Sequence, residues 1–548
     1  MTAPAGDAEP EDFAPRLPPR PTVASLAAPS PFGPPSMQRV GLPPPASTVT
    51  QLAYALRPLA APVVHAPVQR RRVRYRRPSF LARLGIRLVL SAVITLGWWA
   101  ARSFEHRSSS TPPISFPKQW DARVLPIVTF VERERGLVFK HPVQVDFLSE
   151  ADYVAQFTRP TAAPSDAAKK SAADYSALLD AEGLAMHYNA LAGSATVQSV
   201  STLGFYSFSQ RRIIVRGSAL SAPVRVVLAH ELTHVLQDQN FTITTGGPDD
   251  LRLRSVGEAD AMRVDQAYEK TLPKADQGVV DRTNSITPGA QKSLDSVPAA
   301  VVQQQEAPYV LGPLLVSSVY AAHGTAGIDE LLRAPPTEWE LINPWSAARP
   351  LAERTMPVAA PSGAVVFDKP QSLSMLTMLL MLDSWLPWTQ ARGALDDWAG
   401  GGFVSYHKGG ASGPMCFTAT ATFDGSPQPF AAAVARWATA AKSDARPAVH
   451  GGDVTFEACA RASSAKAPPK QVVDTLNAIR IESSTISGSK MTFTTNGVRS
   501  LRCIARFLID DRTVAPLLVK HSWSASEKAT YLFVRNAHLQ RCGLQVGG

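Results

Sequence analysis

Runs of apolar residues separated by polar and glycine-rich turns predict a chain that mixes helices with strands. Residues 143–148 and 211–216 have the length and composition of strands, and residues 253–267 have the apolar spacing of a helix. From there to about Arg333 the pattern is mainly helical. The strongly apolar segment Leu373–Leu386 is too short to span a membrane, so it predicts a buried helix.

A second α+β region is predicted after residue 400, where short apolar runs alternate with helical segments. The predicted strands are residues 403–407, 415–422, 454–460, 491–494 and 530–534, and the predicted helices are residues 430–441 and 472–479. The chain is therefore expected to contain two successive α+β domains.

All four cysteines lie in this second region, and their even number favours disulfide bonds. Three pairings are possible. We expect Cys416–Cys459 and Cys503–Cys542, because Cys416 and Cys459 both lie on predicted strands. A zinc site made of all four cysteines is the alternative, but the sequence contains no Cys-x-x-Cys pair.

The segment Leu88–Ala101 contains no charged residue and predicts part of a membrane-spanning helix. Extended back to Phe80, it reaches the length of about 20 residues that a span needs, and its two arginines can reach the interface. Six arginines between residues 70 and 77 precede it, and a pair of tryptophans lies at its far edge. This charge asymmetry predicts a cytoplasmic N-terminus. A buried core helix is the alternative, which the basic flank disfavours.

The positive charge of the chain is concentrated around this segment. Residues 1–109 hold 14 arginines, no lysine and five acidic residues, so they carry nearly all of the formal net charge of +10. Next to an apolar segment, this favours contact with anionic membrane lipid over nucleic-acid binding. Sixteen of the 46 prolines lie before residue 68, which is typical of an extended, disordered tail.

The sequence His230-Glu231-Leu232-Thr233-His234 predicts a zinc site on a helix. Two histidines four positions apart project from the same face of a helix and can bind one metal ion. The glutamate beside the first histidine lies where it can take a proton from a metal-bound water. Apolar residues flank the sequence on both sides, and Pro223 suits the start of a helix. The alternative is a buried helix whose histidines bind no metal.

A catalytic zinc site needs three protein ligands, and Glu258 is the best candidate for the third. It lies 24 positions after His234, beyond a break that contains glycine and proline, so the chain can return on the predicted helix 253–267. Asp260 is the alternative ligand, but two residues further along a helix its side chain points in another direction.

Zinc held by these three ligands would activate water for peptide hydrolysis, with Glu231 accepting the proton and passing it to the leaving amine. Tyr309 is our candidate for stabilising the negative charge that develops on the carbonyl oxygen, with Tyr320 and His323 as weaker candidates. Packing in an apolar helix is the alternative role of each. Candidate hydrogen-bond partners for the ligand imidazoles are Asp238 and Asp265.

The stretch Ala229–Phe241 resembles a group of bacterial gluzincin-type zinc metallopeptidases, which carry a HELTHALQDQ-F block followed by a Glu-Gly-Asp-Ala block. The second block is Glu258–Ala261 here, with alanine in place of glycine. Softer likenesses, including Pro308–Gly312 and Trp398–Val404, extend the resemblance over roughly residues 117–425.

This resemblance implies a zincin-like α+β fold in which His230, His234 and Glu258 bind Zn²⁺. It also implies an edge strand near residues 211–216 that would bind an extended substrate by main-chain hydrogen bonds.

The predicted organisation has seven parts along the chain. They are a proline-rich cytoplasmic tail (1–69), a basic juxtamembrane segment (70–79), a transmembrane signal-anchor helix (80–101), a linker (102–116), a zinc metallopeptidase-like domain (117–345), a helical connection (346–400) and an α+β domain with disulfides (401–548).

The sequence thus predicts a single-pass membrane protein whose extracytoplasmic domain, periplasmic or extracellular, hydrolyses peptides or proteins with zinc. Two alternatives stay open. One is a protease-like binding module that keeps zinc but not turnover, which the intact Glu231 disfavours. The other is a surface-interaction protein of the cell envelope that acts through its C-terminal domain.

Overall fold

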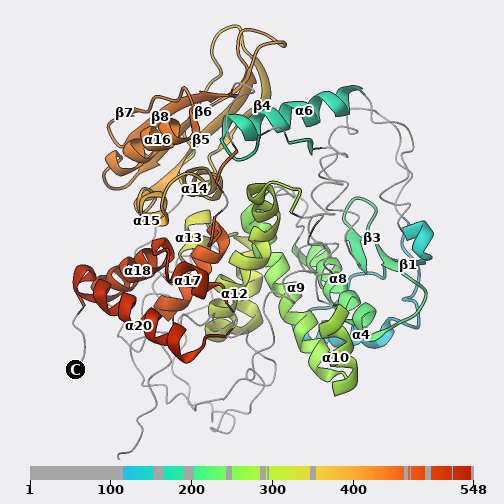
Figure 1. Ribbon diagram of the computed structural model, residues 1–548. Helices are drawn as coiled ribbons and strands as arrows, with labels where there is room; N and C mark the ends of the chain where they lie inside the picture. The colour runs from blue at the N-terminus through green and yellow to red at the C-terminus, as the bar shows by residue number, and fades with distance from the viewer. Residues whose placement is uncertain are drawn as a thin grey trace, which may run out of the picture. The chain divides into compact units, whose positions relative to one another are not determined.

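The computed structural model describes much of the chain after residue 114, and the chain divides into two compact units. The described residues are 115–153, 166–186, 188–190, 203–241, 250–283, 292, 295–345, 353–461, 467–469, 471–487, 495–520 and 522–544. The larger unit ends at Lys470, and the smaller one includes the chain from Gln471 onward (Figure 1). The predicted tail, basic segment and anchor at residues 1–101 lie outside the described residues. Among the residues that are described, no helix is long and apolar enough to cross a membrane.

A three-stranded sheet belongs to the part of the larger unit that carries the predicted metal ligands. Its strands are β1 (Gln144–Leu148), β2 (Gly204–Ser207) and β3 (Arg212–Arg216), in the order β1–β3–β2. β3 runs parallel to β1 and antiparallel to β2. The expectation that residues 211–216 form an edge strand is wrong, because β3 lies in the middle. Its buried run Ile213–Val215 is typical of a strand covered on both faces.

Helices pack around this sheet and around one another. They are α4 (Leu125–Arg135), α8 (Ala222–Phe241), α9 (Leu251–Thr271), α10 (Lys274–Thr283), α12 (Ala299–Arg333) and α13 (Glu338–Ile342). α8 contacts α4, α9 and β2, and its residues are buried from Ala222 to Asp238 apart from Arg225. Leu228, Leu232 and Val235 share a core with residues of α4 and the sheet. The predicted helix therefore exists, and it is a central one.

A glycine allows α12 to approach α9 closely. A Cβ atom added at Gly312 would lie only 1.9 Å from the carbonyl oxygen of Ser255 and 3.0 Å from the Cβ of Ala259. Ser255 and Ala259 flank the predicted ligand Glu258, so the position of this carboxylate depends on the close packing. α12 departs from helical geometry at Gly324, and the chain resumes as helix to Arg333, where helical structure was predicted to end.

A five-stranded antiparallel sheet forms the second part of the larger unit. Its strands are β4 (Val365–Ser372), β5 (Trp398–His407), β6 (Met415–Phe423), β7 (Ala448–His450) and β8 (Asp453–Cys459), in the order β4–β5–β6–β8–β7. The helices that accompany it are α14 (Met375–Asp383), α15 (Trp388–Gly393) and α16 (Gln428–Ala441). The strands predicted at 403–407, 415–422 and 454–460, the helix at 430–441 and the buried helix within 373–386 are confirmed.

The five-stranded sheet also includes or contacts segments that were predicted to belong to other parts of the chain. α6 (Asp166–Ala181) precedes β2 in the chain but packs against β6 and β8. Its Asp174 pairs with the Nε2 atom of His407 at 3.2 Å, and its Asp180 pairs with Arg461 at 3.0 Å. The predicted helical connection at 346–400 contains β4 and the start of β5, whose charged and proline residues concealed the strand. The sheet therefore does not begin at the predicted boundary.

Two glycines of β5 explain the Gly-Gly-Gly run at residues 400–402. A Cβ at Gly400 would lie 2.2 Å from the carbonyl oxygen of Arg354, and a Cβ at Gly402 would lie 2.1 Å from that of Met356. The backbone of Arg354 also exchanges hydrogen bonds with Ala399 and Gly401. The chain before β4 is thereby fastened to the sheet.

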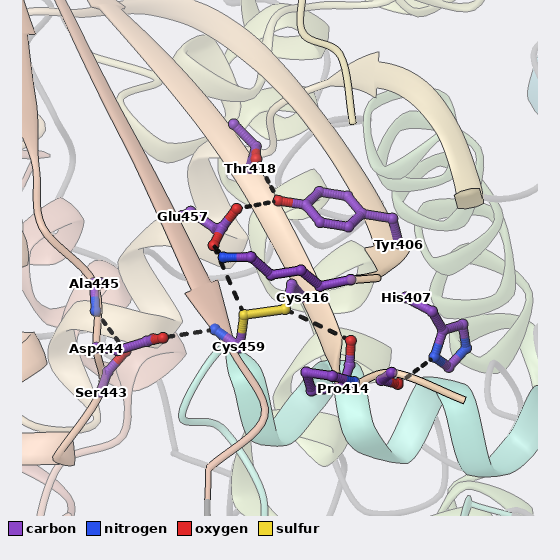
Figure 2. The surroundings of a disulfide bond; sticks show 12 residues. Tyr406, His407, Pro414, Cys416, Thr418, Ser443, Asp444, Ala445, Glu457 and Cys459 are labelled. Carbon is purple, nitrogen blue, oxygen red and sulfur yellow. Dashed lines mark hydrogen bonds and ion pairs between the residues drawn. A yellow bond between two sulfur atoms is a disulfide. The ribbon is translucent and has the colours of Figure 1, made fainter. Parts of the chain in front are cut away.

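Both expected disulfides are present. Cys416 and Cys459 face each other directly across β6 and β8, as Figure 2 shows. Two register pairs further along, the carboxylate of Glu457 accepts a hydrogen bond of 2.6 Å from the hydroxyl of Tyr406. The second disulfide, Cys503–Cys542, lies in the smaller unit.

The smaller unit is helical in its described residues, 471–487, 495–520 and 522–544. Its helices are α17 (Thr475–Ser487), α18 (Thr495–Asp510), α19 (Ala515–Leu518), α20 (Ala525–Leu539) and the 3₁₀ turn η2 (Gln540–Cys542). The helix expected at 472–479 is present from Thr475 onward, whereas the strand expected at 491–494 lies outside the described residues.

The strand expected at residues 530–534 is wrong, because these residues belong to α20. A capping box formed by Ser524 and Glu527 begins the helix six residues earlier, so local start signals outweigh the β-propensity of the run. Together with the unit boundary, this helix means that residues 401–548 are not one α+β domain.

Replacing Gly312 by alanine is expected to destabilise the larger unit by about 1–3 kcal/mol, because the added methyl group would force α12 away from α9. A matched control is Gly278→Ala in α10, where the added Cβ would make only an ordinary contact of 3.5 Å with Arg282. That change should stabilise the helix by about 0.5–1 kcal/mol. Denaturant unfolding of the two variants measures both effects, and equal effects of the same sign would contradict the packing argument.

Candidate metal centre

The two histidines of α8 lie side by side in the core of the larger unit. His230 and His234 are one helical turn apart, and their ring centroids are 4.8 Å apart in an edge-on arrangement. Both side chains are at most 5% exposed. The carboxylate of Glu258 reaches them from α9, as the sequence predicts. These three residues therefore form one buried group contributed by two adjacent helices.

The ligand atoms of this group converge on one point. The Nε2 atoms of the two histidines are 3.1 Å apart. The Oε2 atom of Glu258 lies 3.3 Å from Nε2 of His230 and 3.4 Å from Nε2 of His234. The group could hold a metal ion.

The other nitrogen of each imidazole has an acceptor as its partner. Nδ1 of His230 lies 3.0 Å from a carboxylate oxygen of Asp265, and Nδ1 of His234 lies 3.0 Å from the amide oxygen of Gln237. Because an acceptor faces each Nδ1, each Nδ1 carries the proton in a neutral ring, and each Nε2 presents a lone pair to the common point. Three lone-pair donors that face one another in the core fit a bound cation.

The pKa values of these side chains also favour positive charge at the point where the three ligand atoms meet. Burial alone would lower the pKa of His230, but its hydrogen bonds to Asp265 and Glu258 outweigh burial and raise the pKa to about 10. Burial would also lower the pKa of His234, but the charge and the hydrogen bond of Glu258 outweigh it, so the pKa of His234 is raised. Burial would raise the pKa of Glu258, yet the two imidazoles hold it well below its usual range. Without a metal ion, protons would occupy the position between these side chains.

Glu231 is buried on the same helix and is held by the sheet. The backbone N–H of Tyr206, in β2, donates a hydrogen bond of 2.8 Å to its Oε2 atom. Burial, and to a smaller extent the neighbouring Glu258, raises the pKa of Glu231, although the two histidines oppose that rise. A carboxylate with a raised pKa is a stronger base than an exposed one, which suits a group that accepts a proton.

The structure decides between the two aspartates expected to support the ligands. Asp265 is the partner of His230, as predicted. Asp238 is not the partner of His234, because it accepts a hydrogen bond of 2.9 Å from the hydroxyl of Tyr206 and lies 3.8 Å from Arg211. Asp238 follows His234 by four positions, and its side chain is turned toward Tyr206. Gln237 follows His234 by three positions, and its side chain folds back onto the imidazole of His234.

Asp260 is not a ligand in this arrangement. Its side chain is turned toward Arg135, whose Nε atom lies 2.7 Å from the Oδ2 atom of Asp260, and toward the amide of Gln237. The expectation that a carboxylate two residues after Glu258 points elsewhere is therefore confirmed.

The candidates for stabilising the carbonyl oxygen lie on α12. Tyr309 is buried there, next to the stretch that packs on α9. The ring of Tyr320 lies under the guanidinium group of Arg263 at 4.6 Å, which gives it a packing role. The catalytic role of Tyr309 stays a prediction, as does the weaker one of His323.

Gln237 is the functional side chain that the sequence reasoning missed. Its signal was present in the sequence, since it follows the second ligand by three positions on a helix. Carboxylates are a usual partner of metal-bound imidazoles, so the spacing alone does not single out an amide.

Comparisons of the chain with models of protein families, with curated proteins and with solved structures gave no match. The functional argument therefore rests on the geometry of the site.

Metal binding is expected to become tighter as the pH rises from 7 to 9. The pKa of His230 in the metal-free chain, about 10, lies above its ordinary value of 6.5. The proton on His230 therefore stabilises the metal-free fold below about pH 6.5, and this contribution is lost as the pH rises toward 10. A metal ion must displace this proton, so the affinity should rise about tenfold per pH unit for each proton released.

Titration calorimetry in buffers of different ionisation enthalpy measures the number of protons released. The variant Asp265→Asn loses the carboxylate that favours the doubly protonated ring of His230, so it should release fewer protons. An affinity that does not change between pH 7 and 9 would contradict this account of the site.

Proposed function

We propose that this protein is a zinc-dependent metallopeptidase that hydrolyses peptide bonds. The observation that carries the proposal is the convergence of His230, His234 and Glu258 beside the buried carboxylate of Glu231. A site that only held a metal ion for stability would have no use for a further buried carboxylate next to its ligands, because burying one costs free energy.

The donor set and its spacing favour zinc. Two imidazole nitrogens and one carboxylate oxygen suit Zn²⁺, whereas Ca²⁺ and Mg²⁺ prefer oxygen ligands. Zinc–ligand bonds of about 2.0–2.1 Å in a tetrahedron imply distances of about 3.3–3.4 Å between ligand atoms. The three separations here are 3.1, 3.3 and 3.4 Å. Three protein ligands also leave a fourth position, as catalytic zinc sites require.

Zinc bound here would supply Lewis acidity, which makes water acidic near neutral pH and polarises a carbonyl group. The proton transfers belong to Glu231. The N–H of Tyr206 fixes its Oε2 atom, and we assign Oε1 as the oxygen that takes a proton from the attacking water. The same oxygen then gives this proton to the leaving amine nitrogen, so that the carboxylate is regenerated. The raised pKa of Glu231 suits both steps.

The proposed setting is the outside of a membrane. The two disulfides are typical of an oxidising compartment. The membrane anchor at residues 80–101 and the cytoplasmic tail remain predictions from the sequence. We propose peptides or proteins of the extracytoplasmic space as substrates, by resemblance to bacterial gluzincin-type peptidases.

The metal content of the purified full-length chain tests the first half of the proposal. We expect about one zinc ion per chain, measured by plasma emission spectroscopy. The variants His230→Ala and Glu258→Ala should both lose it, because each removes one ligand. Folded wild-type protein that takes up no zinc when it is offered would overturn the proposal.

Glu231→Gln tests the second half, because the amide keeps the size of the side chain but cannot carry the proton. Hydrolysis of a mixed peptide library, followed by mass spectrometry, should slow by about 10²–10⁴-fold while the zinc content is unchanged. A matched control is Glu340→Gln, a buried glutamate in the capping box of α13, where glutamine also serves. Wild-type activity in Glu231→Gln would remove this residue from the mechanism. Zinc-loaded wild-type protein that hydrolyses no peptide would favour the binding-module alternative.

A further inference from the structure

The side chain of Gln237 is 1% exposed and bridges the two helices of the metal centre. Its oxygen faces Nδ1 of His234 at 3.0 Å. Its nitrogen donates to the carbonyl oxygen of Gly257 at 3.0 Å and to the Oδ2 atom of Asp260 at 2.9 Å. All three contacts are within the range of good hydrogen bonds.

The orientation of this amide follows from its partners. The carbonyl oxygen of Gly257 can only accept a hydrogen bond, so the NH₂ group of Gln237 must lie on that side. Its oxygen then faces His234, and the Nδ1 atom of His234 must carry a proton. The lone pair of Nε2 is thereby directed at Glu258 and His230.

Asp260 holds the NH₂ group in place and is itself held by two arginines. Its Oδ2 atom lies 2.7 Å from the Nε atom of Arg135, and its Oδ1 atom lies 3.5 Å from Arg263. Arg135 pairs in turn with Asp329 of α12 at 2.6 Å. The side chains of Arg135 and Asp260 are fully buried. Removing either partner of a buried ion pair leaves an uncompensated charge in the core, so Asp260 is a firm anchor for Gln237.

The backbone of α9 leaves room for this contact. A Cβ added at Gly257 would lie 3.3 Å from the amide oxygen of Gln237. The residue before the ligand Glu258 is therefore one whose missing side chain lets the amide rest against the helix.

We propose that Gln237 is a positioning residue of the metal centre, which orients His234 as a metal ligand and is held by the buried pair Asp260–Arg135. The proposal rests on metal binding at the site of the proposed function. It adds that the Nδ1 atoms of the two imidazoles have hydrogen-bond partners of different charge. A carboxylate supports His230, and a neutral amide supports His234. The amide adds no negative charge to a site that already buries the carboxylates of Glu231, Glu258 and Asp265.

Two substitutions distinguish the role of the amide oxygen, which accepts from His234, from the role of the NH₂ group, which donates to Asp260. Gln237→Met removes both the acceptor and the donor, and we expect metal affinity to fall about 10–100-fold. Gln237→Glu keeps an acceptor for His234 but places a carboxylate against Asp260. We expect this variant to bind metal within a few fold of the wild type, while the thermal stability of its metal-free form falls.

The affinities are measured on the full-length chain by competition of Zn²⁺ with a chromogenic chelator. Loading with Co²⁺ adds a spectroscopic readout, since its visible absorption changes with the geometry of the ligands. A matched control is Gln239→Met on the same helix. Its amide contacts residues 140 and 141 and no metal ligand among the described contacts, so affinity and spectrum should not change.

If Gln237→Glu folds poorly, the double variant Gln237→Glu/Asp260→Asn exchanges the amide and the carboxylate, which restores a donor–acceptor contact and keeps one negative charge near Arg135. This variant should recover the affinity that Gln237→Met loses. Wild-type affinity and an unchanged Co²⁺ spectrum in Gln237→Met would overturn the proposal, as would weak binding in both variants that keep the acceptor. Because these readouts do not involve hydrolysis, they stay decisive even if the zinc-loaded protein cleaves no peptide.

Discussion

The larger unit depends on how α8 and α9 bury ionisable side chains against each other. Each helix brings several into the core, and an unpaired buried charge costs several kcal/mol. Every one of them is compensated by a partner on the other helix or on a neighbouring element. Glu258 lies against the two histidines, Asp265 supports His230, and Asp260 pairs with Arg135. α12 contributes to this compensation through Asp329, which pairs with Arg135, and β2 contributes through the backbone N–H of Tyr206, which donates to Glu231.

The three residues of the candidate metal centre could be predicted from the sequence, because helical geometry translates spacing into direction. Two residues four apart share a face, and a helix that returns after a glycine-rich break can bring Glu258 back to them. The disulfides could be predicted for a similar reason, since Cys416 and Cys459 lie on strands that turned out to be neighbours. In both cases the geometry is local, or it involves elements that lie close together in the chain.

The features that escaped prediction depend on which elements pack together. Residues 211–216 alternate poorly but were predicted to form a strand, and their expected position at the edge of the sheet came from the family resemblance alone. The aromatic and branched residues at 530–534 suit a strand, but a capping box upstream makes them helical. The support that Gln237 gives to His234 depends on Asp260 and Arg135, which are far apart in the sequence. Spacing alone cannot reveal such a contact, because it forms only after three helices meet.

The attachment of α6 to the five-stranded sheet has a consequence for how this protein can be divided. The chain leaves the part with the candidate metal centre after β1, contributes α6 to the five-stranded sheet, returns for β2 through α13, and then forms that sheet itself. The part with the candidate metal centre is therefore interrupted by a piece of its neighbour, and no single cut separates the two. A gene fragment that ends before residue 353 would encode α6 without the strands that cover it. Each part has its own sheet, but a fragment that holds only one of them would lose the packing of α6 on β6 and β8.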